Sequence, residues 1–261
     1  FGMGAGSSIS ALLGQKDYEK SSKIASSALF VVFVIGTIIS VLGMIFNENI
    51  VSVLGATETI LPYAKSYSMY IFIGTPFICS SFVLNNIMRS QGRAFFSMLG
   101  LSFGGVLNII LDPIFIFVFN MGVRGAALAT VLSQAVGAVW ILHFLTGNKT
   151  ILRLKKANLR LDAKIIGPCL ALGISTFVML STESILSISF TSSLSRYGGD
   201  LAVGAMTIIT STNQLIVMPL QGICQGGQPV ISYNYGAKNN DRVKKAFFTQ
   251  FKACVIFTCI S

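Results

Sequence analysis

Long apolar runs are the feature of this 261-residue chain that most restricts its fold. A bilayer core of about 30 Å requires about 20 mostly apolar residues in a helix. Strands of a membrane β-barrel would instead be shorter segments of alternating polarity. The runs therefore predict an all-α polytopic membrane protein, with partial runs at about 1–13 and 246–261. The complete runs lie at about 24–46, 67–88, 94–119, 126–146, 165–190 and 201–235.

The composition excludes the other broad classes of protein. Hydrophobic residues make up 53% of the chain and charged residues 11%, whereas a soluble domain has about 25% charged residues. Disordered chains are poor in apolar residues and rich in charge. The five cysteines lie in apolar stretches without CxxC spacing, so we expect neither a metal cluster nor a cofactor. The net charge of +10 would suggest nucleic acid in a soluble protein, but here we expect lipid contact and no nucleic acid.

Basic residues are divided unequally between alternate loops. The loops at 14–23, 89–93, 148–164 and 236–245 hold most of the 19 Lys and Arg residues. Because cytoplasmic loops carry the excess of Lys and Arg, this division predicts a multi-pass plasma-membrane protein with these four loops inside the cell. We interpret the basic stretch within 148–164 as a connector on the inner membrane surface, with an RNA- or lipid-binding patch as the alternative. The opposite loops hold only Lys65, Arg124 and Arg196.

The chain also contains an internal repeat. A constant offset that places Gly4 on Gly226 brings identical residues together between positions 4 and 23 far more often than chance allows. The offset spans an even number of crossings, so both copies enter the membrane from the same side. This predicts two six-helix bundles related by a pseudo-two-fold axis along the membrane normal. The identical pairs are Gly4 and Gly226, Ile9 and Ile231, Ser10 and Ser232, Gly14 and Gly236, Lys16 and Lys238, and Lys23 and Lys245.

The repeat gives the expected domain organisation. We expect residues 1–146 to form most of the N-terminal bundle, from the end of helix 2 to helix 6. Residues 147–164 are then the cytoplasmic connector, and residues 165–261 contain helices 7 and 8 and the start of helix 9. The chain begins with Phe1 and stops within an apolar run, so we interpret it as an internal part of a protein of about twelve helices.

Three stretches resemble the multidrug and toxic compound extrusion (MATE) transporters of bacteria. They are residues 108–117 (NIILDPIFIF), 121–130 (MGVRGAALAT) and 225–238 (QGGQPVISYNYGAK). The resemblance implies export of drugs or other small, often cationic, organic compounds. The export would be driven by inward flow of Na⁺ or H⁺, and the two lobes would open alternately to either side. We expect a monomeric full-length protein with no cofactor beyond the coupling ion.

Two other functions are less well supported by the sequence. A flippase for lipid-linked saccharides has a related architecture, but it would need a strongly basic cavity for pyrophosphate, and the basic residues here are confined to loops. A membrane-embedded enzyme would need a catalytic motif such as HExxH, GxSxG or paired acids within a span, and the sequence has none. We therefore predict a transporter and not an enzyme.

Glu183 is the first candidate for ion coupling. Ionisable groups within a span cost about 2.5–3.5 kcal/mol at the bilayer centre, so each is a candidate for function. Glu183 lies well inside the run at 165–190 and is flanked by hydroxyl side chains. Its carboxylate can hold Na⁺, the one metal ion that we expect, or take up a proton. A carboxylate that is merely satisfied by neighbouring hydroxyls is the alternative.

Asp112 and Asn108 are the second candidate. They are one helical turn apart on the same face of the 94–119 run. Pro113 follows directly and loosens the helix, because proline has no amide hydrogen to donate. The pair is either a cation or proton site or an interhelical hydrogen bond that locks the lobe, and the sequence leaves both open.

A polar stripe follows one face of the run at 201–235 at helical periodicity. Such a stripe can line a central cavity and offer neutral donors and acceptors to organic cations. Alternatively, it can hold helices together through amide hydrogen bonds. The candidate cavity residues are Thr207, Thr210, Gln214, Gln221 and Gln225, with Gln228 on the same face.

Overall fold

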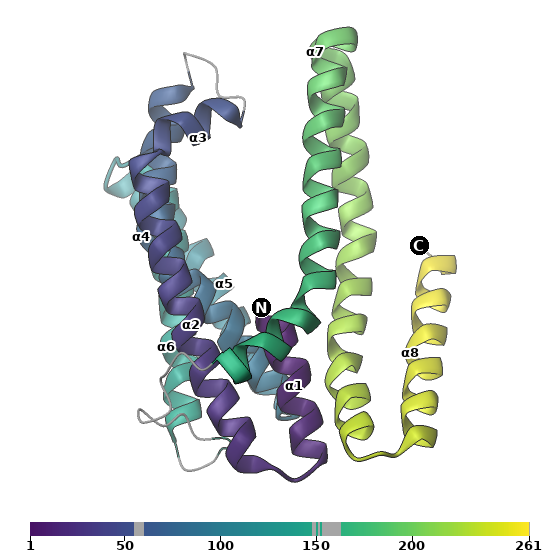
Figure 1. Cartoon of the computed structure of the whole chain (residues 1–261). Coiled ribbons are helices and arrows are strands. Elements are labelled where there is room, and N and C mark those ends of the chain that lie inside the picture. The colour runs from purple at the N-terminus through teal and green to yellow at the C-terminus, as the bar shows by residue number, and fades with distance from the viewer. Residues whose placement is uncertain (55–59, 148–149, 151, 153–162, 261) are drawn as a thin grey trace.

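The computed structural model describes residues 1–54, 60–147, 150, 152 and 163–260, and these residues are helical almost throughout (Figure 1). No strand occurs among them. The elements are α1 (Gly2–Gly14), α2 (Tyr18–Ile45), α3 (Asn47–Val53), α4 (Leu61–Ser90), α5 (Ala94–Pro113), the π-helix η1 (Ile114–Val118), α6 (Val123–Thr146), α7 (Ala163–Gly236) and α8 (Asn240–Ile260).

The predicted all-α membrane fold is confirmed. Every apolar run falls on a helix, and the partial runs at the two ends form α1 and α8. The sequence did not predict α3, which is docked on α4 through Asn47, whose Nδ2 donates to the carbonyl of Lys65 at 3.0 Å. The helical segments long and apolar enough to cross a membrane are Tyr18–Ile45, Leu61–Ser90, Ala94–Val118, Val123–Thr146 and Ile166–Phe190.

The predicted runs at 165–190 and 201–235 belong to one element, α7. A straight helix of its 74 residues would be about 110 Å long. Figure 1 shows instead that α7 folds back as two antiparallel limbs. Its two ends both lie against the short helix α1, Cys169 beside Gly4 and Tyr233 beside Gly14. The sequence predicted a break between two spans, whereas the structure keeps helical backbone through the reversal.

The helices form two groups that are joined through α1. In the first group α4 packs on α2 and α6, and α5 packs on α6, while in the second α8 packs on α7. The short helix α1 contacts α2, α4 and α7. In Figure 1 the groups meet at the end that carries the α1–α2 and α7–α8 turns and separate toward the opposite end. We call the end with these turns the corner end.

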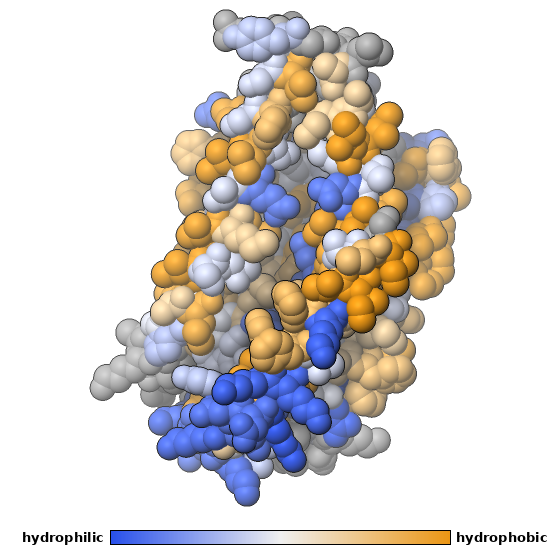
Figure 2. All heavy atoms as spheres, turned by 90° about the vertical axis from the view of Figure 1, so that its right-hand side faces the viewer, coloured by the Kyte–Doolittle hydropathy of each residue, from blue (hydrophilic) through white to orange (hydrophobic). Residues whose placement is uncertain are grey.

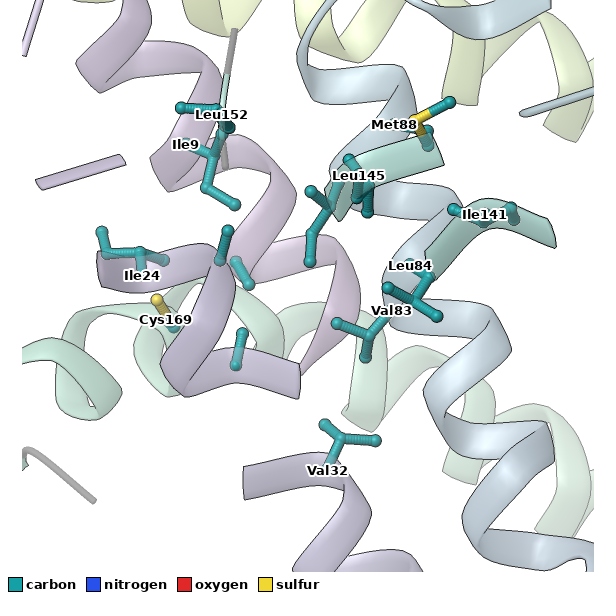
Figure 3. Packing of buried hydrophobic residues seen from close by; sticks show 14 of the residues in the cluster. Ile9, Ile24, Val32, Val83, Leu84, Met88, Ile141, Leu145, Leu152 and Cys169 are labelled. Carbon is teal, nitrogen blue, oxygen red and sulfur yellow. The ribbon is translucent and has the colours of Figure 1, made fainter. Parts of the chain in front are cut away.

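A buried hydrophobic cluster lies where α1, α2, α4 and α6 converge (Figure 3). Ile9 of α1, Leu84 of α4 and Ile141 of α6 have no exposed surface. Two residues from farther along the chain join them, Leu152 and Cys169. Elsewhere large apolar side chains of α2, α5 and α7 are exposed, as expected for helices that contact lipid rather than water.

The turns from α1 into α2 and from α7 into α8 have the same backbone conformation. Lys16 and Lys238 are equivalent in the repeat, and both adopt positive φ, 65° and 57°. The residue after each, Asp17 or Asn239, accepts a hydrogen bond from the main-chain N–H three residues further on, at 3.0 Å and 3.2 Å. Both residues therefore cap the helix that follows. The repeat is thus preserved in individual hydrogen bonds.

The two copies meet in a reciprocal contact between α1 and α7. A Cβ on Gly14 would collide with the carbonyl oxygen of Tyr233, and a Cβ on Gly236 would collide with that of Ala11. Under the repeat offset, Gly14 corresponds to Gly236 and Ala11 to Tyr233. A two-fold axis generates contacts of this kind, in which each partner meets the equivalent of the other. The predicted pseudo-two-fold is therefore confirmed, and we call these four residues the glycine crossing.

The predicted connector, 147–164, lies mostly outside the described residues. Of its described positions, Leu152 is buried, and its main-chain N–H donates to Oε1 of Gln91 at 3.4 Å. The start of the connector is therefore held against the first helical group.

Candidate functional site

The structure brings Asn108 and Asp112 together on α5. Nδ2 of Asn108 donates to Oδ1 of Asp112 at 3.3 Å, and both side chains are half-buried. The ion pairs of the described residues involve other acids, namely Asp17, Glu19 and Glu48. The carboxylate of Asp112 thus has a neutral amide as its partner, within a helix that is otherwise strongly apolar.

The backbone changes directly after this pair. Residues up to Pro113 are α-helical, and Ile114–Val118 form the π-helix η1. Proline has no N–H to donate to the carbonyl one turn earlier, so the regular ladder is interrupted there. Single π-helical turns inside helices occur frequently at functional sites. The sequence-based expectation that Pro113 loosens the helix is borne out in this form.

Glu183 lies apart from any acidic cluster. It is exposed on the first limb of α7. The hydroxyls on either side of it bond to their own helix, Thr182 to the carbonyl of Val178 at 2.8 Å and Ser184 to that of Leu180 at 2.9 Å. No group of three His, Cys, Asp or Glu side chains suited to a metal ion occurs in the part of the chain that the structure describes. The role of Glu183 stays a prediction.

The polar stripe on the second limb of α7 divides into two parts. Thr207, Thr210, Gln214 and Gln221 are exposed. Thr210 donates back to the carbonyls of its own helix at 2.9 Å and 3.0 Å, so its oxygen still has acceptor capacity. Gln225 is half-buried, and its side chain contacts α4 at the corner end, in agreement with the alternative that amides of the stripe hold helices together. We therefore treat Gln225 apart from the cavity candidates.

The contact at Gln225 joins α7 to α4 and α1. The guanidinium of Arg89 donates through Nη1 to Oε1 of Gln225 and through Nη2 to Oδ1 of Asn86, the latter at 3.1 Å. Close by, Nε2 of Gln228 donates to Oγ of Ser7 at 2.6 Å. The void that these residues line is about 10 Å³, which is no larger than one water needs. We call Ser7, Asn86, Arg89, Gln225 and Gln228 the corner-end seam.

Sequence reasoning missed Arg89 as a member of a site and counted it only as a basic loop residue. A usable signal was present, because Asn86 and Arg89 are three residues apart and so share one face of a helix. The pairing with Gln225 had no local signal, since it joins residues that are distant in the sequence.

Internal repeats related by a two-fold axis occur in many membrane transporters, and ionisable groups within spans mark functional sites in such proteins. The family model described as MatE matches residues 1–114 and 175–261. The chain therefore belongs to the MatE family.

Individual relatives agree with this assignment. The chain is 31% identical over 244 residues to the Multidrug export protein MepA of Staphylococcus aureus, covering 94% of this chain and 54% of that protein. It thus spans about half the length of the relative. Such relatives are named as exporters or transporters, in agreement with the prediction that the protein is not an enzyme.

Two solved structures represent different states of a transporter. One is described as the outward-facing conformation of a multidrug resistance MATE family transporter of the MOP superfamily, and it matches with a TM-score of 0.89 at 26% identity. The match covers 98% of this chain and 57% of that one. The other is described as the inward-facing conformation, and it matches with a TM-score of 0.76 at 26% identity, covering 98% and 59%.

Proposed function

We propose that the complete protein exports small organic compounds, often cationic, in exchange for Na⁺ or H⁺ that flows inward. The observation that best supports this function is the bonded pair of Asn108 and Asp112 inside an apolar span. A carboxylate within a membrane span costs free energy, so acidic residues at such positions usually have a function. The relative named as a multidrug export protein supports the substrate class.

The geometry of this pair suits either coupling ion. Asn108 uses its Nδ2 toward Asp112, so its own Oδ1 remains available as a second oxygen ligand beside the carboxylate. Oxygen ligands of this kind suit Na⁺. Alternatively, the carboxylate takes up a proton in place of a metal ion. In both cases binding removes the negative charge of Asp112, and α5 then presents a neutral surface.

The remaining candidates complete the proposed pathway. Glu183 would act as a second coupling carboxylate. Thr207, Thr210, Gln214 and Gln221 would offer neutral hydrogen-bond partners to the substrate, because their side chains are exposed along one limb of α7. A cavity with such a lining accommodates varied cations without binding any of them strongly.

For orientation, we propose that the corner end faces the cytoplasm of a cell whose plasma membrane holds the protein as a monomer. Figure 2 shows hydrophilic residues gathered at the end where α7 turns into α8, with hydrophobic residues along the helices beyond it. Lys16 and Lys238 both lie in turns at this end. An excess of basic residues is typical of cytoplasmic loops.

The test is efflux of ethidium from cells that express the complete protein under an imposed Na⁺ or H⁺ gradient. We expect Asp112→Asn to lower gradient-driven efflux by about tenfold or more, because an ion whose binding is coupled to the substrate by 1–3 kcal/mol changes substrate affinity by about 5- to 150-fold. Asn108→Ala should weaken efflux less, because it leaves the carboxylate in place. Glu183→Gln tests the second carboxylate in the same assay.

Asp17→Asn is the matched control. It also removes one carboxylate, but Asn239 shows that asparagine caps the equivalent helix equally well. Efflux should therefore be unchanged. If Asp112→Asn leaves efflux at the level of Asp17→Asn, the pair is a structural hydrogen bond and coupling must occur elsewhere.

A further inference from the structure

The corner-end seam joins the two bundles that the repeat predicts. We call residues 1–146 the first lobe and residues 165–261 the second lobe. Ser7, Asn86 and Arg89 belong to α1 and α4 in the first lobe, whereas Gln225 and Gln228 belong to the second limb of α7. Its two inter-lobe hydrogen bonds are Arg89 to Gln225 and Gln228 to Ser7. Any movement that parts the lobes at this end must therefore break both.

Arg89 is the member whose environment changes most in such a movement. None of the ion pairs among the described residues includes Arg89, so its charge is balanced by amide oxygens of Asn86 and Gln225. Asn86 is on the same helix and would stay with Arg89. Gln225 is across the seam and would be lost. Hydrogen bonds to a charged donor are stronger than neutral ones, so the closed seam is favoured specifically by the Arg89–Gln225 bond.

The glycine crossing gives a second reason for closure at the same place. It brings the backbones of α1 and α7 into direct contact at their corner ends. Glycine at both positions permits this approach, and the symmetric arrangement means that the two lobes contribute equally. The glycine crossing contributes close packing of the two backbones. The corner-end seam contributes side-chain hydrogen bonds between the lobes.

We propose that Arg89 is a positioning residue for transport, whose bond to Gln225 sets the fraction of molecules in which the corner end is closed. This inference rests on the proposed function, in which the lobes open alternately. A ligand shifts such an equilibrium only by its differential interaction with the two states, and Arg89 has one partner that exists in the closed state alone. The greater similarity to the outward-facing reference, with a TM-score of 0.89 against 0.76, agrees with a closed corner end.

The experiment measures the distance across the corner end in the complete protein, reconstituted in lipid. Spin labels are placed on Lys20→Cys and Arg242→Cys, two exposed and symmetry-related positions, in a background without other cysteines. Double electron–electron resonance then gives the populations of short and long distances. We expect Arg89→Ala to raise the ratio of long to short distances about tenfold or more, as loss of one hydrogen bond to a charged group predicts.

Gln225→Ala should produce a similar shift in the populations. The double variant should shift them little more than either single variant, because both substitutions remove the same hydrogen bond.

Arg93→Ala is the matched control. It removes the same charge four residues further along the chain, directly before α5. There the guanidinium of Arg93 lies over the ring of Phe96 within the first lobe, 5.8 Å from its centroid. Its distance distribution should match that of the unmodified protein.

The proposal is overturned if Arg89→Ala leaves the populations unchanged, or if Arg93→Ala shifts them equally. If Arg89→Ala does not yield folded protein, the result for Gln225→Ala tests the proposal, because this variant removes the same hydrogen bond but retains Arg89. Unchanged populations in Gln225→Ala would then overturn the proposal. The readout requires no substrate. If Arg89→Ala shifts the populations but the unmodified protein exports no drug, only the proposed function is refuted. If the unmodified protein exports drugs but Arg89→Ala shifts nothing, only the role of Arg89 is refuted.

Discussion

The α1–α2 turn and the α7–α8 turn, which we call the two corners, have equivalent hydrogen bonds, but the helices that follow them differ in burial. Both have a lysine at positive φ followed by a capping residue. Ala25 of α2 is nevertheless fully buried, whereas Phe247, its equivalent on α8, is 54% exposed. The turn is thus determined by its own few residues, while burial is determined by which helices lie alongside.

The neighbours account for this difference. In the first copy α4 and α1 cover α2, whereas among the described elements α8 packs mainly on α7. Ala28 is 2% exposed in the hydrophobic cluster. Its equivalent on α8 is Gln250, a residue whose amide makes one long bond of 3.5 Å to the carbonyl of Cys224. A duplicated segment can therefore keep its local structure while its outer faces adapt to different surroundings.

The largest effect should come from the glycine crossing. Gly14→Ala and Gly236→Ala each introduce a Cβ into a backbone carbonyl of the other helix, and no flexible side chain is available to yield. We expect each to lower the free energy of unfolding by about 3 kcal/mol, with equal losses because the contacts are symmetric. Thermal unfolding in detergent measures this.

Gly167→Ala serves as its control, since a Cβ there has no neighbour within 4 Å. It should unfold at the temperature of the unmodified protein or slightly above it, because alanine favours a helix over glycine by about 0.5–1 kcal/mol. Unequal losses at Gly14 and Gly236 would show that the two copies have diverged at the crossing itself.

A smaller effect is expected from exchanging the side chains at one pair of equivalent positions. Ala28→Gln forces an amide into the hydrophobic cluster and should cost about 2–3 kcal/mol of stability. Gln250→Ala removes one long hydrogen bond and should change stability by about 0.5 kcal/mol or less. Chemical denaturation of the two variants gives the comparison. Comparable losses would mean that α8 is covered in the complete protein as tightly as α2.

The smallest effects concern the capping residues. Asp17→Ala and Asn239→Ala should each cost about 1 kcal/mol, because each removes the acceptor for one main-chain N–H at a helix start. The reciprocal exchanges Asp17→Asn and Asn239→Asp should cost only a few tenths of a kcal/mol. Helix content and thermal unfolding can be followed together by circular dichroism. A large loss for either exchange would contradict the equivalence of the corners.

Much of the fold was predictable because its signals are local. Apolar length located the spans, and the spacing of Asn108 and Asp112 placed them on one face, where they bond. The repeat could be recognised because its identical residues have the same local role in both copies. Gly14 and Gly236 permit a close approach, and Lys16 and Lys238 lie in equivalent turns. These constraints depend on a few consecutive residues, so a single sequence contains them.

The rest depends on contacts between distant segments. The pairing of Arg89 with Gln225 could not be predicted, because nothing near Arg89 specifies which helix will face it. For the same reason Gln225 was placed with the cavity residues, since helical periodicity gives the face of a residue but not its neighbour. The reversal within α7 was expected as a loop, because sequence patterns do not distinguish a turn from a sharply bent helix.

Lys16 and Lys238 show what the corners require electrostatically. A left-handed conformation costs a non-glycine residue about 1–2 kcal/mol, and glycine would avoid this strain. Each lysine instead stands two residues beyond the end of a helix, α1 or α7, where the partial negative charge of the helix dipole attracts a cation. Under the orientation proposed above, the same charge would also contribute to retention of these turns on the cytoplasmic side. A single side chain would then both stabilise a helix terminus and add to the charge bias that orients the protein.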